Sequence, residues 1–320
     1  MRMTPRRRRP SLRPAAPRRE DGGLPAAVKP SGPRRGRARL DCAARRACAP
    51  GMTHEDWVGR TETRIDIVGA HLLHGLAATL GVAVPERLPP LWHWTLFQDW
   101  VMPDRLGPDG HPRRGGFLPP VDDLPRRMWA GGRVRFLRPL HAGEAVQRRS
   151  TILAVKEKQG GSGRLVFVTV AHAIEGPRGP AIEEEQDIVY RGAEGAAAKP
   201  ADPAPPAPPG ALRAAVLPDP VLLFRYSALT GNGHRIHYDM DYVRGVEGYP
   251  GLVVHGPLQA TWLAGLLTNR EVAAFSFRGM RPAFHGAPLA TEAWEDGGAW
   301  RLRTLDEGGR VCMAAEATLA

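Results

Sequence analysis

The chain has 320 residues, and its 44 lysine and arginine residues against 33 acidic residues give a formal net charge of +11. Residues 1–52 hold 15 of those basic and 3 of the acidic residues, net +12, which leaves 29 and 30, net −1, for residues 53–320. The basic character therefore belongs to an N-terminal tail, and the nearly neutral body is not expected to bind nucleic acid. No stretch approaches 18 consecutive apolar residues, so no membrane span is expected either.

Residues 1–52 are rich in arginine, proline and alanine and include the run Arg6–Arg9. Such a segment cannot bury enough apolar surface to offset the entropy lost on ordering, so we predict a disordered tail. It lacks the apolar region of a secretory signal, and its prolines would break the amphipathic helix of a mitochondrial transit peptide. Weak binding to nucleic acid or to an anionic surface stays open. We favour translation that starts at Met52, where a globular pattern begins abruptly, with the tail an over-extended reading frame.

The three cysteines are Cys42 and Cys48 in the tail and Cys312 in the body. A single body cysteine cannot form a disulfide framework, and this usage is typical of the reducing cytoplasm, where we expect the protein. Cys312 stands between Val311 and Met313, which predicts a buried strand residue rather than a nucleophile.

A proline- and alanine-rich segment at residues 193–211 divides the body. Its proline density disfavours helix and sheet and predicts an extended linker between residues 53–192 and residues 212–320. Both flanking parts have the size of an ordinary domain. They share the pattern Arg-Pro-x-x-x-Gly at the end of an alternating apolar strand, at Arg138–Gly143 and again at Arg281–Gly286.

Matching elements surround the two copies of this pattern. In each part a helix-like apolar segment comes first, and two strand-like runs separated by a glycine-rich turn come last. The predicted helices are Val68–Leu80, Val221–Thr230 and Pro257–Leu267, and the predicted strands are Thr151–Lys156, Leu165–Ile174, Ala299–Leu305 and Val311–Thr318. The repetition predicts a duplicated α+β unit, a sheet wrapped around a helix.

The densest polar cluster of the chain follows the linker. A helical run ends at Gly231, so residues 232–239 form a loop of the kind that presents binding groups from a rigid scaffold. Further on, an apolar run meets His255-Gly256-Pro257, where another helix begins. Proline suits the first turn of a helix, and the free backbone N–H groups there favour developing negative charge.

These two segments resemble the hydratase-2 motif of MaoC-like hotdog enzymes. The correspondence covers Thr230–Asn232, Ile236–Asp239 and Val254–Gly256. It extends to the double-hotdog branch that includes 3-methylfumaryl-CoA (mesaconyl-CoA) hydratase and 3-hydroxyacyl-thioester dehydratase type 2. The resemblance implies a tandem (double) hotdog, an α+β fold in which each antiparallel sheet wraps around a central helix. It also implies that residues 53–192 help to hold an acyl thioester and that residues 212–320 carry the catalytic loop.

The resemblance further implies catalytic roles for three residues. His237 matches the motif histidine, which would activate water or shuttle the α-proton, because an imidazole titrates near the working pH. Gly256 matches the glycine whose N–H would hold the thioester oxygen as it becomes enolate-like. Asn232 stands where the general motif has aspartate; an amide cannot accept a proton, so it would orient water or substrate through hydrogen bonds. Asp239 would orient His237 or solvate the loop, and we favour the second role.

Four further residues of the two segments are candidates for contacts with the substrate: Tyr226, His234, Arg235 and His255. His234 and Arg235 would meet the phosphates of CoA or a substrate carboxylate, since arginine is well shaped for bidentate carboxylate binding. Solvation of the loop is the competing interpretation for both.

Other polar and aromatic clusters have simpler interpretations. His71 and His74 have helical spacing but no cysteine or acidic partner at ligand spacing, so we predict no metal site and no redox cofactor. The aromatic run from Trp92 to Trp100 lacks interleaved basic residues and is expected to pack against an acyl chain or in the core. The three consecutive glutamates at residues 183–185 predict a solvated strand end.

The combined prediction is a hydro-lyase that adds water reversibly to an enoyl-CoA. The branch resemblance points to 3-methylfumaryl-CoA (mesaconyl-CoA), with citramalyl-CoA as product, and a 3-hydroxyacyl-thioester dehydratase of fatty-acid metabolism is the alternative. A hotdog thioesterase and a non-catalytic acyl-CoA-binding protein also stay open. The expected partner is the acyl-CoA substrate, with no nucleic acid and no membrane, and the sequence leaves a homodimer open.

Overall fold

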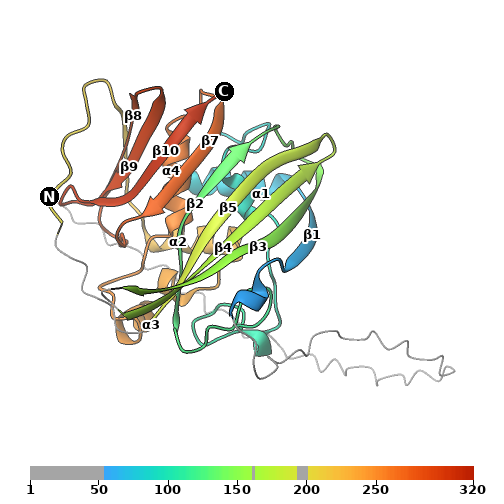
Figure 1. The fold of residues 1–320 in the computed structure, drawn as a ribbon. Helices are drawn as coiled ribbons and strands as arrows, with labels where there is room; N and C mark the ends of the chain where they lie inside the picture. Colours follow the sequence, from blue (N-terminus) through green and yellow to red (C-terminus); the bar gives the residue numbers. More distant parts are fainter. Residues whose placement is uncertain (1–53, 161–162, 193–200) are drawn as a thin grey trace, which may run out of the picture. The chain divides into compact units, whose positions relative to one another are not determined.

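The computed structural model describes residues 54–160, 163–192 and 201–320 (Figure 1). The predicted tail, residues 1–52, and residues 193–200 of the predicted linker lie outside the described residues. The strands of the described part are β1 (Thr61–Ile67), β2 (Arg126–Phe136), β3 (Ala145–Gly160), β4 (Gly163–Gly176), β5 (Gly179–Arg191), β6 (Leu212–Val216), β7 (Val272–Gly279), β8 (Leu289–Asp296), β9 (Ala299–Leu305) and β10 (Val311–Leu319).

The strands form one antiparallel sheet in the order β1-β3-β4-β5-β2-β7-β10-β9-β8-β6. The first five come from the first half of the body and the last five from the second. Strands β2 and β7 join the halves, from Gly131 opposite Arg278 to Arg135 opposite Ala274. A Cβ at Gly131 would lie 2.5 Å from the Phe277 carbonyl oxygen, so only glycine permits the two strands to approach this closely.

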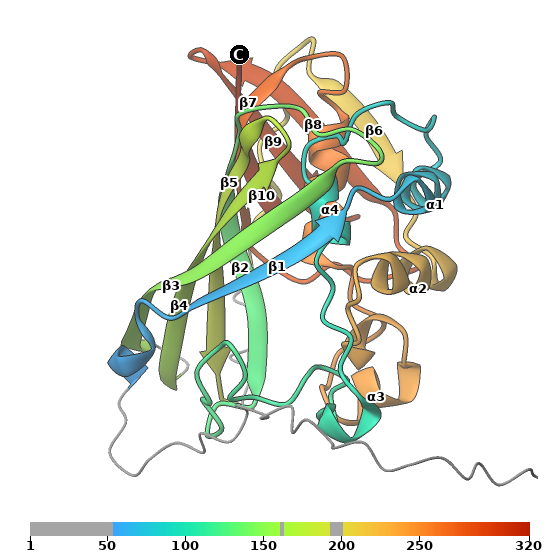
Figure 2. The same ribbon diagram turned by 90° about the vertical axis from the view of Figure 1, so that its right-hand side faces the viewer.

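Helices cover one side of this sheet. Figure 2 shows α1, α2 and α4 on the side toward which the strands curve. The α-helices are α1 (Ala70–Leu80), α2 (Pro220–Leu229), α3 (Met240–Gly245) and α4 (Gly256–Gly265), and the short 3-10 helices are η1 (His54–Trp57), η2 (Trp92–Thr95), η3 (Pro103–Arg105) and η4 (Arg235–His237). One buried apolar cluster includes residues of both halves, among them Leu76 of α1 and Leu258 of α4.

The internal repeat predicted from Arg-Pro-x-x-x-Gly has the same backbone hydrogen bonds in both copies. In the first half the Arg138 N–H donates to the Ala181 carbonyl, and in the second the Arg281 N–H donates to the Cys312 carbonyl, both at 3.2 Å. The two arginines thus mark the same point, where a strand leaves its neighbour in the sheet.

The glycine of each copy also has the same task. Gly143 and Gly286 adopt φ angles of +87° and +81°, which a residue with a side chain rarely adopts. Each donates its N–H at 2.8 Å to a backbone carbonyl that lies just before a helix. Gly143 donates to the Val68 carbonyl before α1, and Gly286 donates to the Pro218 carbonyl before α2. The repeated pattern therefore connects the sheet to the equivalent helix of its own half.

The two halves differ in the helix that follows an isolated β-bridge. A bridge joins Val253 to Phe284 in the second half, and α4 starts three residues after Val253. The corresponding bridge of the first half joins Arg87 to His141, and it is followed by Pro89-Pro90 and the single turn η2 instead of a long helix. Proline lacks the N–H that a longer helix needs, so the first half keeps only this turn.

The predicted boundaries lie close to the observed ones. The helix expected from residue 68 begins at Ala70, and the linker predicted to end at residue 211 is followed at Leu212 by β6. Strands β3 and β4 are longer than predicted and form a hairpin across the glycine-rich segment. The division into two domains stays a prediction. No helix within the described ranges is long and apolar enough to cross a membrane.

Candidate active site

A cavity of about 150 Å³ lies where the two halves meet. The first half contributes residues of η2, β2, β3, β4 and β5, and the second contributes residues of α2, of the polar loop and of the start of α4. Its lining includes Trp94, Arg148, Glu184, Tyr226, Asn232 and Pro257. The cavity therefore brings the predicted catalytic loop and the predicted helix start to one place, opposite the first half.

Asn232 is placed by the end of α2. Gly231 adopts φ +60°, which turns the chain, and the Asn232 N–H then donates to the Ser227 carbonyl at 2.9 Å. The side-chain oxygen of Asn232 accepts a hydrogen bond from the His234 N–H at 3.0 Å. Because the oxygen is used in this turn, the amide NH₂ is the group that Asn232 offers to the cavity.

His237 ends the short helix η4 and is 6% exposed. Its Nδ1–H donates to the Val253 carbonyl at 2.7 Å, which leaves Nε2 as the ring nitrogen with a free lone pair. Burial lowers the pKa of His237 to about 4, and the hydrogen bond to Val253, which raises the pKa, offsets only part of this effect. At neutral pH the ring is a neutral base. His237 does not itself line the 150 Å³ cavity.

His255 stacks on His237, with the ring centroids 3.6 Å apart and the planes at 17°. Its Nε2 shares a 2.8 Å hydrogen bond with the Ser227 hydroxyl, and its Nδ1 is buried without a partner among the described residues. The buried Tyr226 ring, which lines the cavity, meets His255 edge-on at 5.0 Å. Tyr226 lines the cavity, and the His255 ring contacts both Tyr226 and His237. Substrate contacts by Tyr226 and His255 stay predictions.

Buried neutral histidines should make the fold sensitive to mild acid. Burial lowers the pKa of His237 and of His172 to about 4 and that of His255 well below its usual value. An unfolded chain binds these protons near pH 6.5, so stability present above pH 6.5 is lost as the pH falls toward 4. Each such histidine adds about 1.4 kcal/mol per pH unit to that slope.

The measurement is the free energy of unfolding between pH 7.5 and pH 4.5. His172 lies outside the cavity and bonds the Ser150 hydroxyl. We expect His172→Gln to lower the free energy of unfolding at pH 7.5. The variant should also show a smaller pH dependence of that free energy, by the amount that corresponds to the uptake of about one proton. Parallel curves for the variant and the wild type would contradict this assignment.

The start of α4 offers backbone donors beside the cavity. Pro257, which has no N–H, lines the cavity, and the Gly256 N–H before it has no backbone acceptor within the described ranges. The first hydrogen bond of the helix runs from the Gln259 N–H to the His255 carbonyl at 3.1 Å. The free donor and the helix dipole together favour negative charge at this end of the cavity.

Arg235 holds the loop of residues 232–239, predicted to be catalytic, in place. Its guanidinium pairs with Asp239 at 2.7 Å, donates to the Pro108 carbonyl at 3.1 Å and lies over the Tyr242 ring at 4.3 Å. Asp239 also caps α3 by accepting from the Tyr242 N–H at 3.0 Å, so it serves the loop and the helix and does not bond His237. Contact of Arg235 with substrate stays a prediction.

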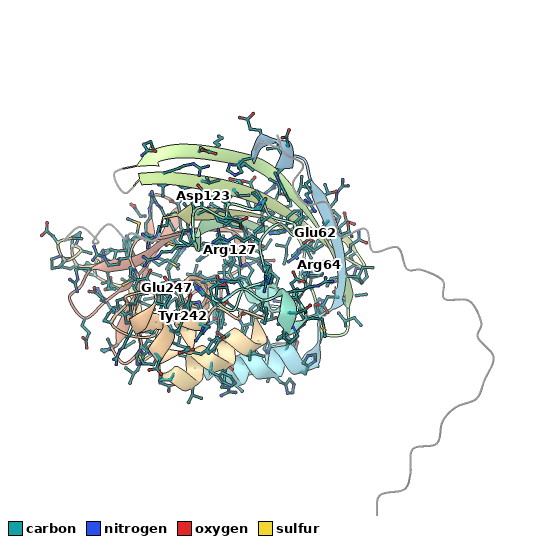
Figure 3. All side chains as sticks on the ribbon, turned by 90° about the horizontal axis from the view of Figure 1, so that it is seen from below. Glu62, Arg64, Asp123, Arg127, Tyr242 and Glu247 are labelled. Carbon is teal, nitrogen blue, oxygen red and sulfur yellow. The ribbon has the colours of Figure 1, made fainter. Side chains whose placement is uncertain are left out.

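The first half supports α3 as well. Arg126 of β2 forms an ion pair with Glu247 at 3.3 Å, and Glu247 lies beside Tyr242 in Figure 3. The Tyr242 hydroxyl donates to Glu247 at 3.4 Å. The segment that follows the predicted catalytic loop is therefore anchored to the sheet of the other half.

His234 faces the segment that follows η3. Its ring packs on His111 with centroids 4.3 Å apart, and the Arg235 N–H donates to the Asp109 carbonyl at 2.9 Å. The backbones also touch, because a Cβ at Gly110 would lie 2.0 Å from the Gly233 carbonyl oxygen. Nothing in the sequence patterns indicated that this segment contacts the predicted catalytic loop.

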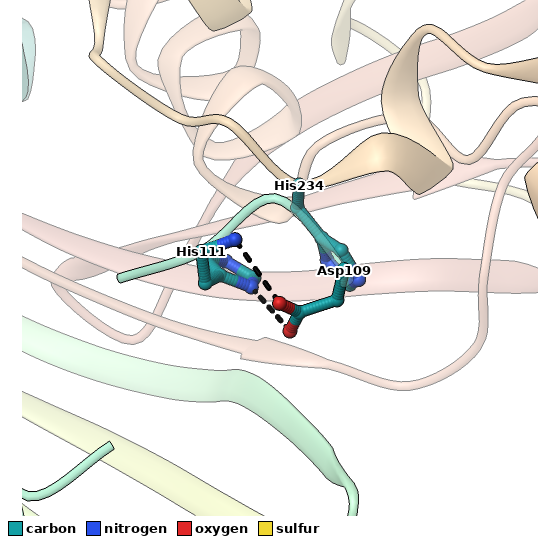
Figure 4. A group of neighbouring side chains, drawn as sticks. All are labelled: Asp109, His111 and His234. Atoms are coloured by element: carbon teal, nitrogen blue, oxygen red, sulfur yellow. Dashed lines mark hydrogen bonds and ion pairs between the residues drawn. The ribbon is translucent and has the colours of Figure 1, made fainter. Parts of the chain in front are cut away.

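Asp109, His111 and His234 are the described residues that could together hold a metal ion (Figure 4). Their ligand atoms lie within 4.8 Å of one another, and two imidazoles with one carboxylate suit a divalent transition metal. The Asp109 carboxylate is already used, since it accepts from the His111 N–H at 3.1 Å and from His111 Nδ1–H at 3.0 Å. Burial and the nearby His111 lower the pKa of His234 to about 2.

Glu184 corrects one prediction. The three glutamates at 183–185 were expected to be solvated, but Glu184 is 4% exposed and lines the cavity. It accepts from Trp94 Nε1 at 2.8 Å and from the Gln186 side chain at 3.0 Å, and it pairs with His93 at 3.1 Å. Burial alone would raise the pKa of Glu184, yet His93 and these donors lower it to about 2. Strand alternation, which turns the middle glutamate inward, was the signal that could have revealed it.

The aromatic run of the first half is largely interior, as predicted. Trp94 and Phe97 line the cavity, and Trp94 packs edge-on against Trp129 at 4.9 Å. Trp100 is 75% exposed and does not belong to this group. Cys312 is buried in β10, and burial raises the pKa of its thiol to about 11, in agreement with a structural role.

Sequence comparison decides the family. Residues 91–285 match the family described as hydroxyacyl-thioester dehydratase type 2. The chain is also 44% identical over 271 residues to the mesaconyl-C(4)-CoA hydratase of Chloroflexus aurantiacus, covering 82% of this chain and 96% of that protein. The chain belongs to the hydroxyacyl-thioester dehydratase type 2 family. It is a hydro-lyase, as the sequence predicts.

Solved structures agree on the fold. A MaoC-like dehydratase from Phytophthora capsici superimposes with a TM-score of 0.63 at 17% identity, covering 84% of this chain and 98% of that one. A Mycobacterium tuberculosis protein with a double hotdog fold superimposes with a TM-score of 0.52 at 14% identity, covering 82% and 96%. The predicted MaoC-like double hotdog is confirmed.

Proposed function

We propose that this dehydratase-family enzyme hydrates mesaconyl-C4-CoA reversibly to citramalyl-CoA. The relative with 44% identity is named a mesaconyl-C(4)-CoA hydratase and is matched over 96% of its length. The cavity supports the assignment, because about 150 Å³ accommodates a ligand the size of benzene and a short branched acyl group fits the same space. A cavity of this volume favours a short acyl group over a long one.

The proposed chemistry uses Asn232, which lines the cavity, and the N–H of Gly256, which precedes the lining residue Pro257. Its base is His237, which stacks on His255 beside the lining residue Tyr226. Water is held by the Asn232 amide and gives a proton to Nε2 of His237 as its oxygen bonds to the β-carbon. The C=C electrons move toward the thioester, whose oxygen becomes enolate-like and is held at the start of α4 by the Gly256 N–H. His237 then returns the proton to the α-carbon. The residues used are those of the sequence motif, and a single base serves both proton transfers.

The test is the ultraviolet absorbance of the enoyl thioester after addition of enzyme. The absorbance of mesaconyl-C4-CoA should fall. Loss of absorbance with crotonyl-CoA or a long-chain enoyl-CoA would report the alternative, the dehydratase activity of fatty-acid metabolism. A thiol reagent in the same experiment detects a thioesterase. Reaction of the long-chain substrate in preference to mesaconyl-C4-CoA would contradict the proposed substrate, and binding without turnover would indicate an acyl-CoA-binding protein.

The proposal includes an acyl-CoA partner and a cytoplasmic location. The location rests on the single body cysteine, Cys312, which is buried and unpaired with another cysteine among the described residues. The proposal also includes substrate contacts by four residues, Tyr226, His234, Arg235 and His255. It further includes formation of a homodimer.

The role of Asn232 can be tested by restoring the aspartate of the general motif. Asn232→Asp keeps the oxygen that accepts from the His234 N–H, so the turn and the melting temperature should be retained. It replaces the NH₂ donor by a carboxylate oxygen, and we expect kcat to fall about tenfold, the equivalent of one lost hydrogen bond. An increase in kcat would show instead that a second base is useful at this position.

A further inference from the structure

Arg148 is a buried cation of the cavity that the motif does not include. It lies on β3, its side chain is 18% exposed, and it lines the cavity together with Asn232. Its Nε is buried with no hydrogen-bond partner in the described part of the chain. Burial lowers the pKa of Arg148. A buried guanidinium with an unused donor is costly unless something pairs with it.

The acidic groups near Arg148 are already engaged elsewhere. Its ion pair with Glu62 of β1 is long, 3.7 Å, and Glu62 also pairs with Arg64 at 3.3 Å; Figure 3 shows Glu62 and Arg64 side by side on β1. Arg64 in turn pairs with Asp99 at 3.2 Å. Glu184 shares the cavity, but its oxygens bond Trp94, His93 and Gln186 and it forms no ion pair with Arg148 among the described residues.

We propose that Arg148 binds the free carboxylate of a short dicarboxylic acyl thioester and thereby selects substrates that carry a carboxylate on the β-carbon. The proposal rests on the proposed function and names the residue that selects its substrate. The planar guanidinium suits a carboxylate, which accepts two parallel hydrogen bonds from it. The Nε–H that has no partner supplies one of them.

The arrangement of the cavity explains why one arginine is enough. The thioester oxygen is held at the start of α4 and the carboxylate by Arg148, so both ends of the acyl group are bound within about 150 Å³. The carboxylate is attached to the β-carbon, which is the atom that water attacks. Binding of this group therefore positions the reacting carbon, and the positive charge offsets the repulsion between the carboxylate and the incoming oxygen.

The test compares two substrates that differ in one group. In 3-methylcrotonyl-CoA a methyl group replaces the free carboxylate of mesaconyl-C4-CoA. We expect Arg148→Met to lower kcat/KM for mesaconyl-C4-CoA about 100-fold, the effect of removing one partner of a buried charge pair. The variant should keep kcat/KM for 3-methylcrotonyl-CoA within about threefold or raise it, because that substrate cannot pair with arginine. Arg148→Lys keeps the positive charge but loses the two parallel donors of the guanidinium. Its kcat/KM for mesaconyl-C4-CoA should therefore lie between those of the wild type and of Arg148→Met.

Arg149→Met is the matched control, since Arg149 is the next residue of β3 and is exposed on the opposite face. Arg149→Met should leave kcat/KM unchanged for both substrates. Wild-type enzyme that fails to hydrate mesaconyl-C4-CoA overturns the proposed function. Wild-type enzyme that does hydrate it, with Arg148→Met leaving the ratio between the two substrates unchanged, overturns the role of Arg148 alone.

Stability gives an independent readout. Replacing a buried, incompletely paired charge by an apolar side chain of similar length should leave the melting temperature of Arg148→Met unchanged or higher. A lower melting temperature accompanied by equal losses on both substrates would show that Arg148 only supports the fold.

Discussion

Replacing His237 by alanine should lower kcat for hydration about 1,000-fold while the protein stays folded, because the proposed mechanism loses its one proton-transferring group. The effect is large because Asn232, which stands where the general motif has aspartate, cannot accept a proton. Measurement of kcat with saturating mesaconyl-C4-CoA, together with the melting temperature, separates loss of chemistry from loss of fold.

The pH profile adds a second readout for His237. Burial lowers its pKa to about 4, so the ring is neutral and active above that value and protonated below it. We therefore expect kcat/KM of the wild type to decline with an acid limb well below the usual histidine pKa of about 6.5. His74→Ala, an exposed histidine of α1, is the control and should keep full activity. An undiminished rate in His237→Ala would remove His237 from the mechanism.

Replacing Gly256 by proline should lower kcat about 100-fold or more, because it removes the backbone N–H proposed to hold the enolate-like oxygen. Gly256 is the first residue of α4, where proline fits a helix, and His255 before it has the extended φ and ψ of −57° and 134° that a proline requires of its predecessor. The measurement is kcat with KM determined separately, since the loss should lie in kcat.

Gly256→Ala is the matched control for this experiment. It keeps the N–H, Gly256 does not adopt a positive φ, and the added Cβ would lie 3.7 Å from the Met313 methyl group, an ordinary contact. We expect its kcat to stay within about threefold of the wild type. Equal losses in the proline and alanine variants would mean that the glycine is needed for space and not for its donor.

Local patterns carried most of the information about the catalytic segments. The turn at Gly231, the short run to His237 and the helix that begins at Gly256 are all set by residues close in sequence, through backbone hydrogen bonds and the conformational limits of glycine and proline. The repeat at Arg138 and Arg281 was readable for the same reason, since each copy uses the same local hydrogen bonds.

Residues that lie far from this motif escaped sequence reasoning. Arg148 and Glu184 are ordinary charged residues of two strands, and their inward direction depends on the strand register and on which face of the sheet is covered. Asp109 and His111 belong to a segment without helical or strand periodicity, so only the tertiary structure shows that it contacts the loop of residues 232–239. Glu184 was predicted on the surface because three adjacent glutamates suggest solvent when the alternation of a strand is ignored.

The sequence by itself determined the family, the order of elements and the histidine, asparagine and glycine of the proposed mechanism, because short-range conformational preferences and a long motif specify them. Only the tertiary structure decided that the first half lines a cavity together with Asn232 and the start of α4, and that Arg148 stands there without a full partner. The reason is physical: a cavity of about 150 Å³ is a property of the junction of β2 with β7 and of everything packed around it, and such long-range contacts leave no periodic mark on the chain.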